Sequence, residues 1–138
     1  MIIPRRPISS NKGNNPKFNA AINQAAQARK PAILDGPLYA RILWFHKTRT
    51  DQDTDNIAKR ILDALKGVVF VDDFVIPHCL TVRVDATVDY ELSDSMIAIA
   101  DYQLLLQMLA DETQANVLYI EVHNCPAITR TESVGWRS

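Results

Sequence analysis

Aspartates flank both ends of an amphipathic helix pattern in residues 53–73, and this arrangement constrains the fold more than any other feature of the chain. Asp53 and Asp55 precede the pattern, while Asp72 and Asp73 follow it within an apolar run. Apolar residues recur between them at helical spacing, at Ile57, Ile61, Leu62 and Leu65. The pattern predicts a helix from about Asp55 with one buried face, and acids from two segments near its ends.

Gly67 is placed to end this helix, because glycine readily adopts the left-handed backbone found after helix C-termini. The apolar run that follows predicts a short strand over 68–71, a tight turn at Asp72 and Asp73, and a returning strand. The other predicted elements are a helix over 18–29, strands over 38–45, 80–88 and 117–122, and a largely apolar helix over 94–111.

These elements predict one α/β (α+β) domain over residues 1–138, with a small mixed sheet and helices packed mainly on one side. Residues 1–16 contain three prolines and predict an irregular basic arm, and residues 124–138 predict a loose C-terminal tail. No apolar run approaches the roughly 20 residues that span a bilayer. We therefore expect a soluble cytoplasmic protein with no membrane partner.

The charges are divided unevenly along the chain. Residues 1–70 carry 12 lysines and arginines against 5 acids, whereas residues 71–138 carry 3 against 11. Such a division suggests a basic face with an anionic partner such as DNA, although scattered solvated lysines would give the same counts. The candidate DNA-binding residues are Arg5, Arg6, Lys12, Lys47, Arg49 and Arg60.

A calcium-binding EF-hand is the first alternative for the acids, because Asp51, Asp53 and Asp55 match its first three ligand positions. The sequence excludes it. The position that needs a turn-forming glycine is Asn56, and the position that needs a bidentate glutamate is Leu62. Converging carboxylates without histidine or cysteine ligands instead favour Mg²⁺ or Mn²⁺.

The runs DTDNIAKRILDALKG, residues 53–67, and VFVDDFVI, residues 69–76, resemble the signature of the RusA-like Holliday junction resolvases. In that family a DxDN motif, a lysine and a DAL motif precede an acidic pair on the next strand. The resemblance covers about 25 residues. The preceding strand and the N-terminus with its prolines and arginines also fit the family's layout.

The resemblance implies a Mg²⁺-dependent, homodimeric endodeoxyribonuclease from a bacterial or phage context, for which Mn²⁺ is a substitute ion. Such an enzyme makes paired nicks across a four-way DNA junction. The metal-binding carboxylates carry over to Asp53, Asp55 and Asp73, and the essential lysine carries over to Lys59. Asp72 matches the other member of the acidic pair and is an additional candidate ligand.

Two other functions remain open at this point: a junction-binding protein that does not cut, and a metal-dependent phosphohydrolase acting on a smaller substrate. Each residue also has a purely structural interpretation. Asp55 can cap the helix, Lys59 can pair with Asp63, and the Asp72–Asp73 pair can form a turn. His46 and His78 flank the acidic segment, and we interpret both as structural. The long helix after Val88 departs from the family's layout.

Overall fold

The computed structural model of residues 1–138 describes all residues except 9–14, 30–31, 49–53, 89–96, 98 and 126–138. The strands are β1 (Ile2–Ile3), β2 (Leu38–His46), β3 (His78–Asp85) and β4 (Asn116–Asn124). The helices are α1 (Pro16–Ala28), α2 (Thr54–Leu65) and α3 (Ile99–Ala110), with a short 3₁₀ helix η2 (Asp73–Val75). None of the described helices is long and apolar enough to cross a membrane.

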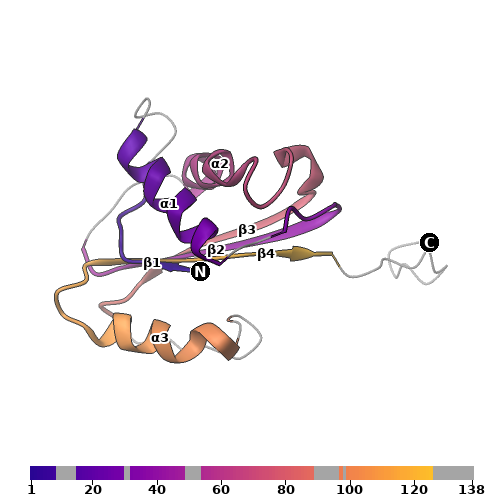
Figure 1. The fold of residues 1–138 in the computed structure, drawn as a ribbon. Helices are drawn as coiled ribbons and strands as arrows, with labels where there is room; N and C mark the ends of the chain where they lie inside the picture. The colour runs from indigo at the N-terminus through magenta and orange to yellow at the C-terminus, as the bar shows by residue number, and fades with distance from the viewer. Residues whose placement is uncertain (9–14, 30–31, 49–53, 89–96, 98, 126–138) are drawn as a thin grey trace, which may run out of the picture.

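The four strands form one mixed sheet in the order β1-β4-β2-β3. β2 and β3 are parallel, while β4 pairs antiparallel with both β1 and β2. Figure 1 shows α1 and α2 over one face of this sheet and α3 over the opposite face. The predicted α+β class with a mixed sheet is therefore confirmed, with α1 and α2 together on one side.

α2 is the crossover between the parallel strands β2 and β3. It begins after the end of β2, and the chain beyond its last residue leads back to the start of β2, where His78 of β3 pairs beside Tyr39. Parallel neighbours require such a connection, since a tight turn can join only antiparallel strands. The two ends of α2 therefore lie toward opposite ends of these strands.

Two apolar cores lie on the two faces of the sheet. The core beneath α1 and α2 contains Phe18, Ile22, Trp44, Ile57, Ile61 and Leu65. The core beneath α3 contains Leu43, Phe45, Leu105, Leu109 and Tyr119. This arrangement confirms the predicted buried face of α2, although Leu62 is only partly buried.

Local signals explain where α1 and α2 begin and end. The Asn15 side chain accepts a hydrogen bond of 3.0 Å from the Phe18 backbone N–H and so caps α1, which starts two residues before the predicted position. Gly67 has a φ of 83°, as the prediction of a left-handed residue after α2 requires.

The structure corrects two predictions around these elements. Ile2 and Ile3, which we placed in an irregular arm, pair with β4 as β1. The predicted strand over 68–71 and its return are also wrong, because Phe70 forms only isolated bridges, with Leu34 and Lys66. The backbone N–H groups of Val68 and Val69 instead donate back to the Leu65 carbonyl, which continues the helix end as a turn.

α3 is less covered than its composition suggests. Leu105 and Leu109 pack on the sheet, whereas Leu104 and Leu106 on the other side of the helix are exposed. Among the described residues, this largely apolar helix is covered on one side. Residues 94–96 and 98 of the predicted helix lie outside the described residues.

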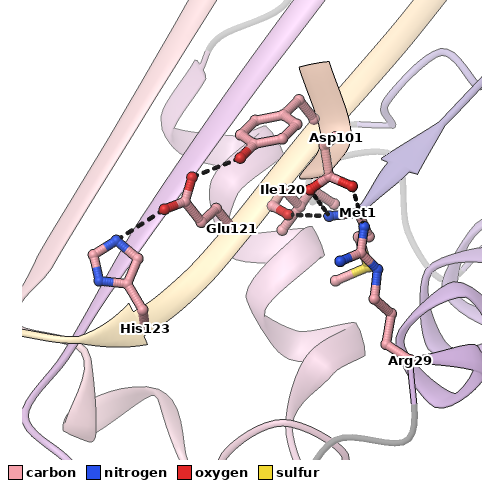
Figure 2. Close-up of polar contacts among 7 residues, drawn as sticks. Met1, Arg29, Asp101, Ile120, Glu121 and His123 are labelled. Carbon is pink, nitrogen blue, oxygen red and sulfur yellow. Dashed lines mark hydrogen bonds and ion pairs between the residues drawn. The ribbon is translucent and has the colours of Figure 1, made fainter. Parts of the chain in front are cut away.

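An ion pair connects the layers on the two faces of the sheet. Arg29, which follows α1, pairs with the buried Asp101 carboxylate of α3 (Figure 2). The Met1 amino group lies 3.8 Å from the other Asp101 oxygen and donates a 2.7 Å hydrogen bond to the Ile120 carbonyl. This linkage holds β1 and α3 against β4 at the edge of the sheet.

Candidate active site

The first predicted acidic segment leads into the N-terminus of α2. Asp53 lies outside the described residues, and for Asp55 the structure gives only the backbone, in the first turn of α2. Lys59 follows one turn later, and its side chain is 65% exposed. Its ammonium group is therefore accessible to a ligand that approaches the N-terminal half of α2.

Acidic and basic side chains alternate from Lys59 to the end of α2 and beyond. Lys59 Nζ lies 3.6 Å from Asp63 Oδ2, and Lys66 Nζ lies 4.0 Å from Asp63 Oδ1. Lys66 Nζ also lies 3.3 Å from Asp72 Oδ1. The predicted pairing of Lys59 with Asp63 is confirmed, and Asp72 is bound to the C-terminal end of the helix. Sequence reasoning missed Lys66, although its spacing of seven from Lys59 placed it on the same helix face.

The second acidic segment packs against the chain that leads into β2. The Leu34 N–H donates a 2.8 Å hydrogen bond to the Val69 carbonyl, and a Cβ added at Gly36 would lie 2.7 Å from Val75 Cβ. Asp73, described here by its backbone, is the first residue of η2. The acidic pair therefore lies near the N-terminal end of β2.

The structure does not bring the two acidic segments together within the described residues. Asp55 is at the N-terminus of α2, whereas Asp72 contacts Lys66, one residue past the C-terminus. The described side chains include no group of three or more acids, histidines or cysteines that could hold a metal ion. A carboxylate site for one metal ion would therefore have to include Asp53, Asp55 or Asp73, whose side chains are not among those described.

The predicted DNA-binding residues differ in their accessibility. Arg5 and Arg6 are exposed, and Lys12 and Arg49 lie outside the described residues. Lys47 is partly buried, and its Nζ donates a 2.8 Å hydrogen bond to the Asp111 carbonyl at the end of α3. Arg60 is only 6% exposed. This burial leaves Arg60 little surface for the direct DNA contact that we predicted.

Among the described side chains, the two flanking histidines belong to no group that could hold a metal ion. His46 is buried, and its Nδ1 lies 2.9 Å from the Thr48 carbonyl.

A second polar cluster, which the sequence gave no reason to expect, lies on β4. Glu121 accepts a 2.6 Å hydrogen bond from the Tyr119 hydroxyl and lies 3.0 Å from His123 Nε2 (Figure 2). Trp44 is buried in the core, and Trp136 lies outside the described residues.

Comparison with known families identifies a match over most of the chain's first 91 residues. The family model described as Endodeoxyribonuclease RusA matches residues 8–91, which is more than half of the chain. The matched range includes both acidic segments, Lys59, α2 and the parallel strands β2 and β3. α3 and β4 follow the matched range. A search of curated proteins found no match.

Proposed function

The chain belongs to the endodeoxyribonuclease RusA family, and from this premise we propose that it resolves four-way DNA junctions by Mg²⁺-dependent, paired phosphodiester hydrolysis. The family match carries this proposal, since it includes every candidate catalytic residue. We further propose that residues 1–138 act as one nuclease domain and that two copies act together, because two symmetric nicks need two equivalent sites.

The proposed metal ligands are Asp53, Asp55 and Asp73, with Asp72 as an additional candidate. These side chains offer only hard oxygen donors, which suit Mg²⁺ and also Mn²⁺. When bound, the ion lowers the pKa of an attacking water and offsets the charge of the phosphate. The chemistry of these oxygen donors fits the ion.

Lys59 has the role of binding the scissile phosphate. Its exposed ammonium group lies one turn from Asp55, and an ammonium there offsets the negative charge that develops on the phosphate oxygens. Asp63 orients this ammonium in the DNA-free protein at 3.6 Å. The exposed Arg5 and Arg6 supply further phosphate contacts that position the DNA without reading its sequence.

A cleavage assay on a synthetic four-way junction tests this function. Wild-type protein with Mg²⁺ is expected to nick opposing strands, and Asp55→Asn and Lys59→Ala are each expected to lower the nicking rate by about 100-fold or more. Glu112→Gln, which makes the same acid-to-amide change at an exposed site outside the proposed machinery, should match wild type. Equal nicking of unbranched duplex would contradict selectivity for junctions.

Binding measurements separate the two remaining functions. A protein that binds junctions tightly but never nicks them with Mg²⁺ or Mn²⁺ would be a binding module. A protein that hydrolyses small phosphodiesters but neither binds nor cleaves DNA would be a phosphohydrolase. For the nuclease, Asp55→Asn should bind the junction as tightly as wild type or more tightly, because it removes a negative charge beside the phosphate.

A further inference from the structure

The chain leaves β2 through residues 46–48, which we call the β2 exit, and it is held there on both faces of the sheet. His46 is the last residue of β2, and the side chains of His46 and Lys47 point to opposite faces because successive residues of an extended chain alternate. The ring centroids of His46 and Trp44 lie 5.3 Å apart, in the core beneath α1 and α2. Lys47 instead reaches the C-terminal end of α3, which lies over the other face (Figure 1).

The connection from α3 to β4 supplies the contacts on one face. Lys47 Nζ donates a 2.8 Å hydrogen bond to the Asp111 carbonyl, and the Lys47 backbone N–H donates a 2.9 Å bond to the Ala115 carbonyl. Asp111 directly follows α3, where the helix dipole is negative and stabilises an ammonium group. The Thr113 backbone N–H and hydroxyl both donate to the Asp111 carboxylate. The β2 exit is therefore attached to a turn that is fixed by its own hydrogen bonds.

His46 fixes the β2 exit on the other face. Its Nδ1 lies 2.9 Å from the Thr48 carbonyl, and because a carbonyl only accepts, this nitrogen carries the proton. The His46 carbonyl accepts a 2.8 Å hydrogen bond from the backbone N–H of Ala86, just beyond β3. His46 is only 8% exposed, so water competes little for the hydrogen bond of its ring. The path of the chain after β2 is thus set as far as Thr48.

The β2 exit leads directly into the first acidic segment. Asp53 and Asp55 follow Thr48 by five and seven positions. At the far end of this connection, α2 is anchored by the buried Ile57 and Ile61. A connection this short absorbs little displacement of either end, because few backbone dihedrals are free to compensate. The position of the β2 exit therefore limits where the two acids can lie.

Lys47 is poorly placed for the direct DNA contact that we predicted. Its ammonium group faces α3, whereas the exposed Lys59 lies on α2, over the opposite face of the sheet. The connection that holds Lys47 carries two acids, Asp111 and Glu112, so DNA phosphates would be repelled there. The contacts of Lys47 favour a role within the fold over a role on the DNA surface.

We infer that α3 and its connection to β4 position the first acidic segment for metal binding, with Lys47 and His46 as the positioning residues. This inference rests on the proposed metal-dependent function, and it gives a role to the helix that follows the family match. Lys47 ties the β2 exit to the end of α3, and His46 sets the direction in which the chain leaves the strand. Both act through Asp53 and Asp55, and not by touching the ion or the DNA.

Lys47→Met tests this role, because methionine keeps the length of the side chain but cannot donate the hydrogen bond. In DNA-free protein we expect the Mn²⁺ dissociation constant, followed by electron paramagnetic resonance, to rise about tenfold. Lys47→Arg retains a donor and should keep the wild-type Mn²⁺ affinity. Lys17→Met, which removes an exposed lysine from α1, is the charge-matched control and should also match wild type. Wild-type Mn²⁺ affinity in Lys47→Met would overturn the inference.

Two substitutions of His46 separate its hydrogen bond from its packing. His46→Phe keeps a ring against Trp44 but loses the donor to Thr48, whereas His46→Asn keeps a donor in nearly the same position and loses the ring. We expect His46→Phe to weaken Mn²⁺ binding about tenfold and His46→Asn to keep the Mn²⁺ affinity within about twofold. Urea denaturation measures the stability of both variants. A Mn²⁺ affinity that follows stability, and not the hydrogen bond, would overturn the positioning role.

Junction affinity distinguishes positioning from direct DNA contact. A lysine that binds a phosphate displaces a counterion, so its loss reduces the slope of log affinity against log salt by about 0.9. For Lys47→Met we expect unchanged junction affinity and salt slope without metal, and a kcat of nicking that falls about tenfold at unchanged KM. Arg5→Met, at a proposed DNA contact, should reduce the slope. A reduced slope in Lys47→Met would overturn the inference in favour of DNA contact.

Nicking by the wild-type protein separates this inference from the proposed function. Wild type that nicks junctions, combined with Lys47→Met that binds Mn²⁺ normally, would leave the nuclease function intact and overturn the positioning role. Wild type that binds Mn²⁺ but never nicks, combined with weakened Mn²⁺ binding in Lys47→Met, would uphold the positioning role and overturn the nuclease function. Wild type that neither nicks nor binds Mn²⁺ would overturn both.

Discussion

Lys66 Nζ lies 3.3 Å from Asp72 Oδ1, and this ion pair binds the second acidic segment to the C-terminal end of α2. Both side chains are more than a third exposed, so water and salt weaken their attraction. We expect Lys66→Gln to lower the free energy of unfolding by less than about 1 kcal/mol. Urea denaturation measures this change, with Lys17→Gln on α1 as the control. A loss well above that of the control would mean that the pair holds the segment in place.

Asp63 lies between two lysines, and its removal should strengthen DNA binding. Lys59 Nζ and Lys66 Nζ lie 3.6 Å and 4.0 Å from its two carboxylate oxygens. Asp63→Asn removes the charge that competes with phosphate for both ammonium groups. We expect junction affinity without metal to rise roughly two- to tenfold at low salt, and the gain to shrink as salt increases. Fluorescence anisotropy measures it, and a reduced affinity would contradict a phosphate-binding role for Lys59.

Glu112→Gln is the matched control for that experiment. Glu112 is exposed and follows α3, the helix that lies over the opposite face of the sheet from α2. The substitution changes the net charge of the protein by the same amount as Asp63→Asn. An equal gain in affinity from both variants would indicate a general effect of net charge, with no specific contribution from the α2 lysines.

Arg29 offsets the negative charge of the buried Asp101 carboxylate. Replacing Arg29 should therefore lower the free energy of unfolding more than replacing a surface arginine does. Asp101 is only 6% exposed and is paired with Arg29, with the Met1 amino group 3.8 Å away. Arg29→Met leaves this carboxylate with the Met1 amino group as its remaining ion-pair partner. Because the Arg29 side chain is itself half exposed, we expect the free energy of unfolding to fall by about 2 kcal/mol, which is less than for a fully buried pair.

The exposed Arg5 is the control for Arg29. Arg5→Met should change the free energy of unfolding by no more than about 0.5 kcal/mol, which urea denaturation resolves. Equal losses from the two variants would show that the Arg29–Asp101 pair adds nothing beyond surface charge.

Sequence alone predicted those elements whose signals are local. α2 is specified by the spacing of Ile57, Ile61 and Leu65 together with a terminal glycine, and its limits were predicted closely. The prediction of a strand over 68–71 was wrong because Val69 and Phe70 are buried in the core without pairing as a regular strand. A short apolar run looks the same in either role.

Features that depend on distant contacts could not be predicted in this way. The position of β4 between β1 and β2 depends on pairings between residues that are distant in sequence, such as Leu38 with Asn124. For the active site, motif spacing identified the candidate acids, and these assignments stay predictions. The spacing did not reveal that a straight helix holds Asp55 and Asp72 apart, because this follows from the parallel register of β2 and β3.

The Asp111 carboxylate should titrate at unusually low pH because of Thr113. Asp111 Oδ1 accepts hydrogen bonds from the Thr113 hydroxyl at 2.7 Å and from its backbone N–H at 2.9 Å, and these lower the pKa of Asp111 below 3.8. A lowered pKa in the folded state adds stability above about pH 4, which is lost as pH falls through the folded pKa. NMR titration of the carboxyl carbon should show the pKa rising toward 3.8 in Thr113→Val, whereas Thr113→Ser keeps it low.

Gly36 controls the position of η2, and a side chain there should disturb the second acidic segment. An added Cβ would lie 2.7 Å from Val75 Cβ and 3.0 Å from the Val75 carbonyl oxygen, so the backbone of η2 must move. We expect Gly36→Ala to cost about 1–3 kcal/mol, as overpacking does, and to weaken Mn²⁺ binding through Asp73. Gly67→Ala is the contrasting variant. An alanine is strained at the φ of 83° found here, which should lower the free energy of unfolding by about 1–2 kcal/mol. Its Cβ would meet no atom within 4 Å, so the Mn²⁺ affinity should stay unchanged. Equal Mn²⁺ affinities in the two variants would remove the η2 segment from the proposed metal site.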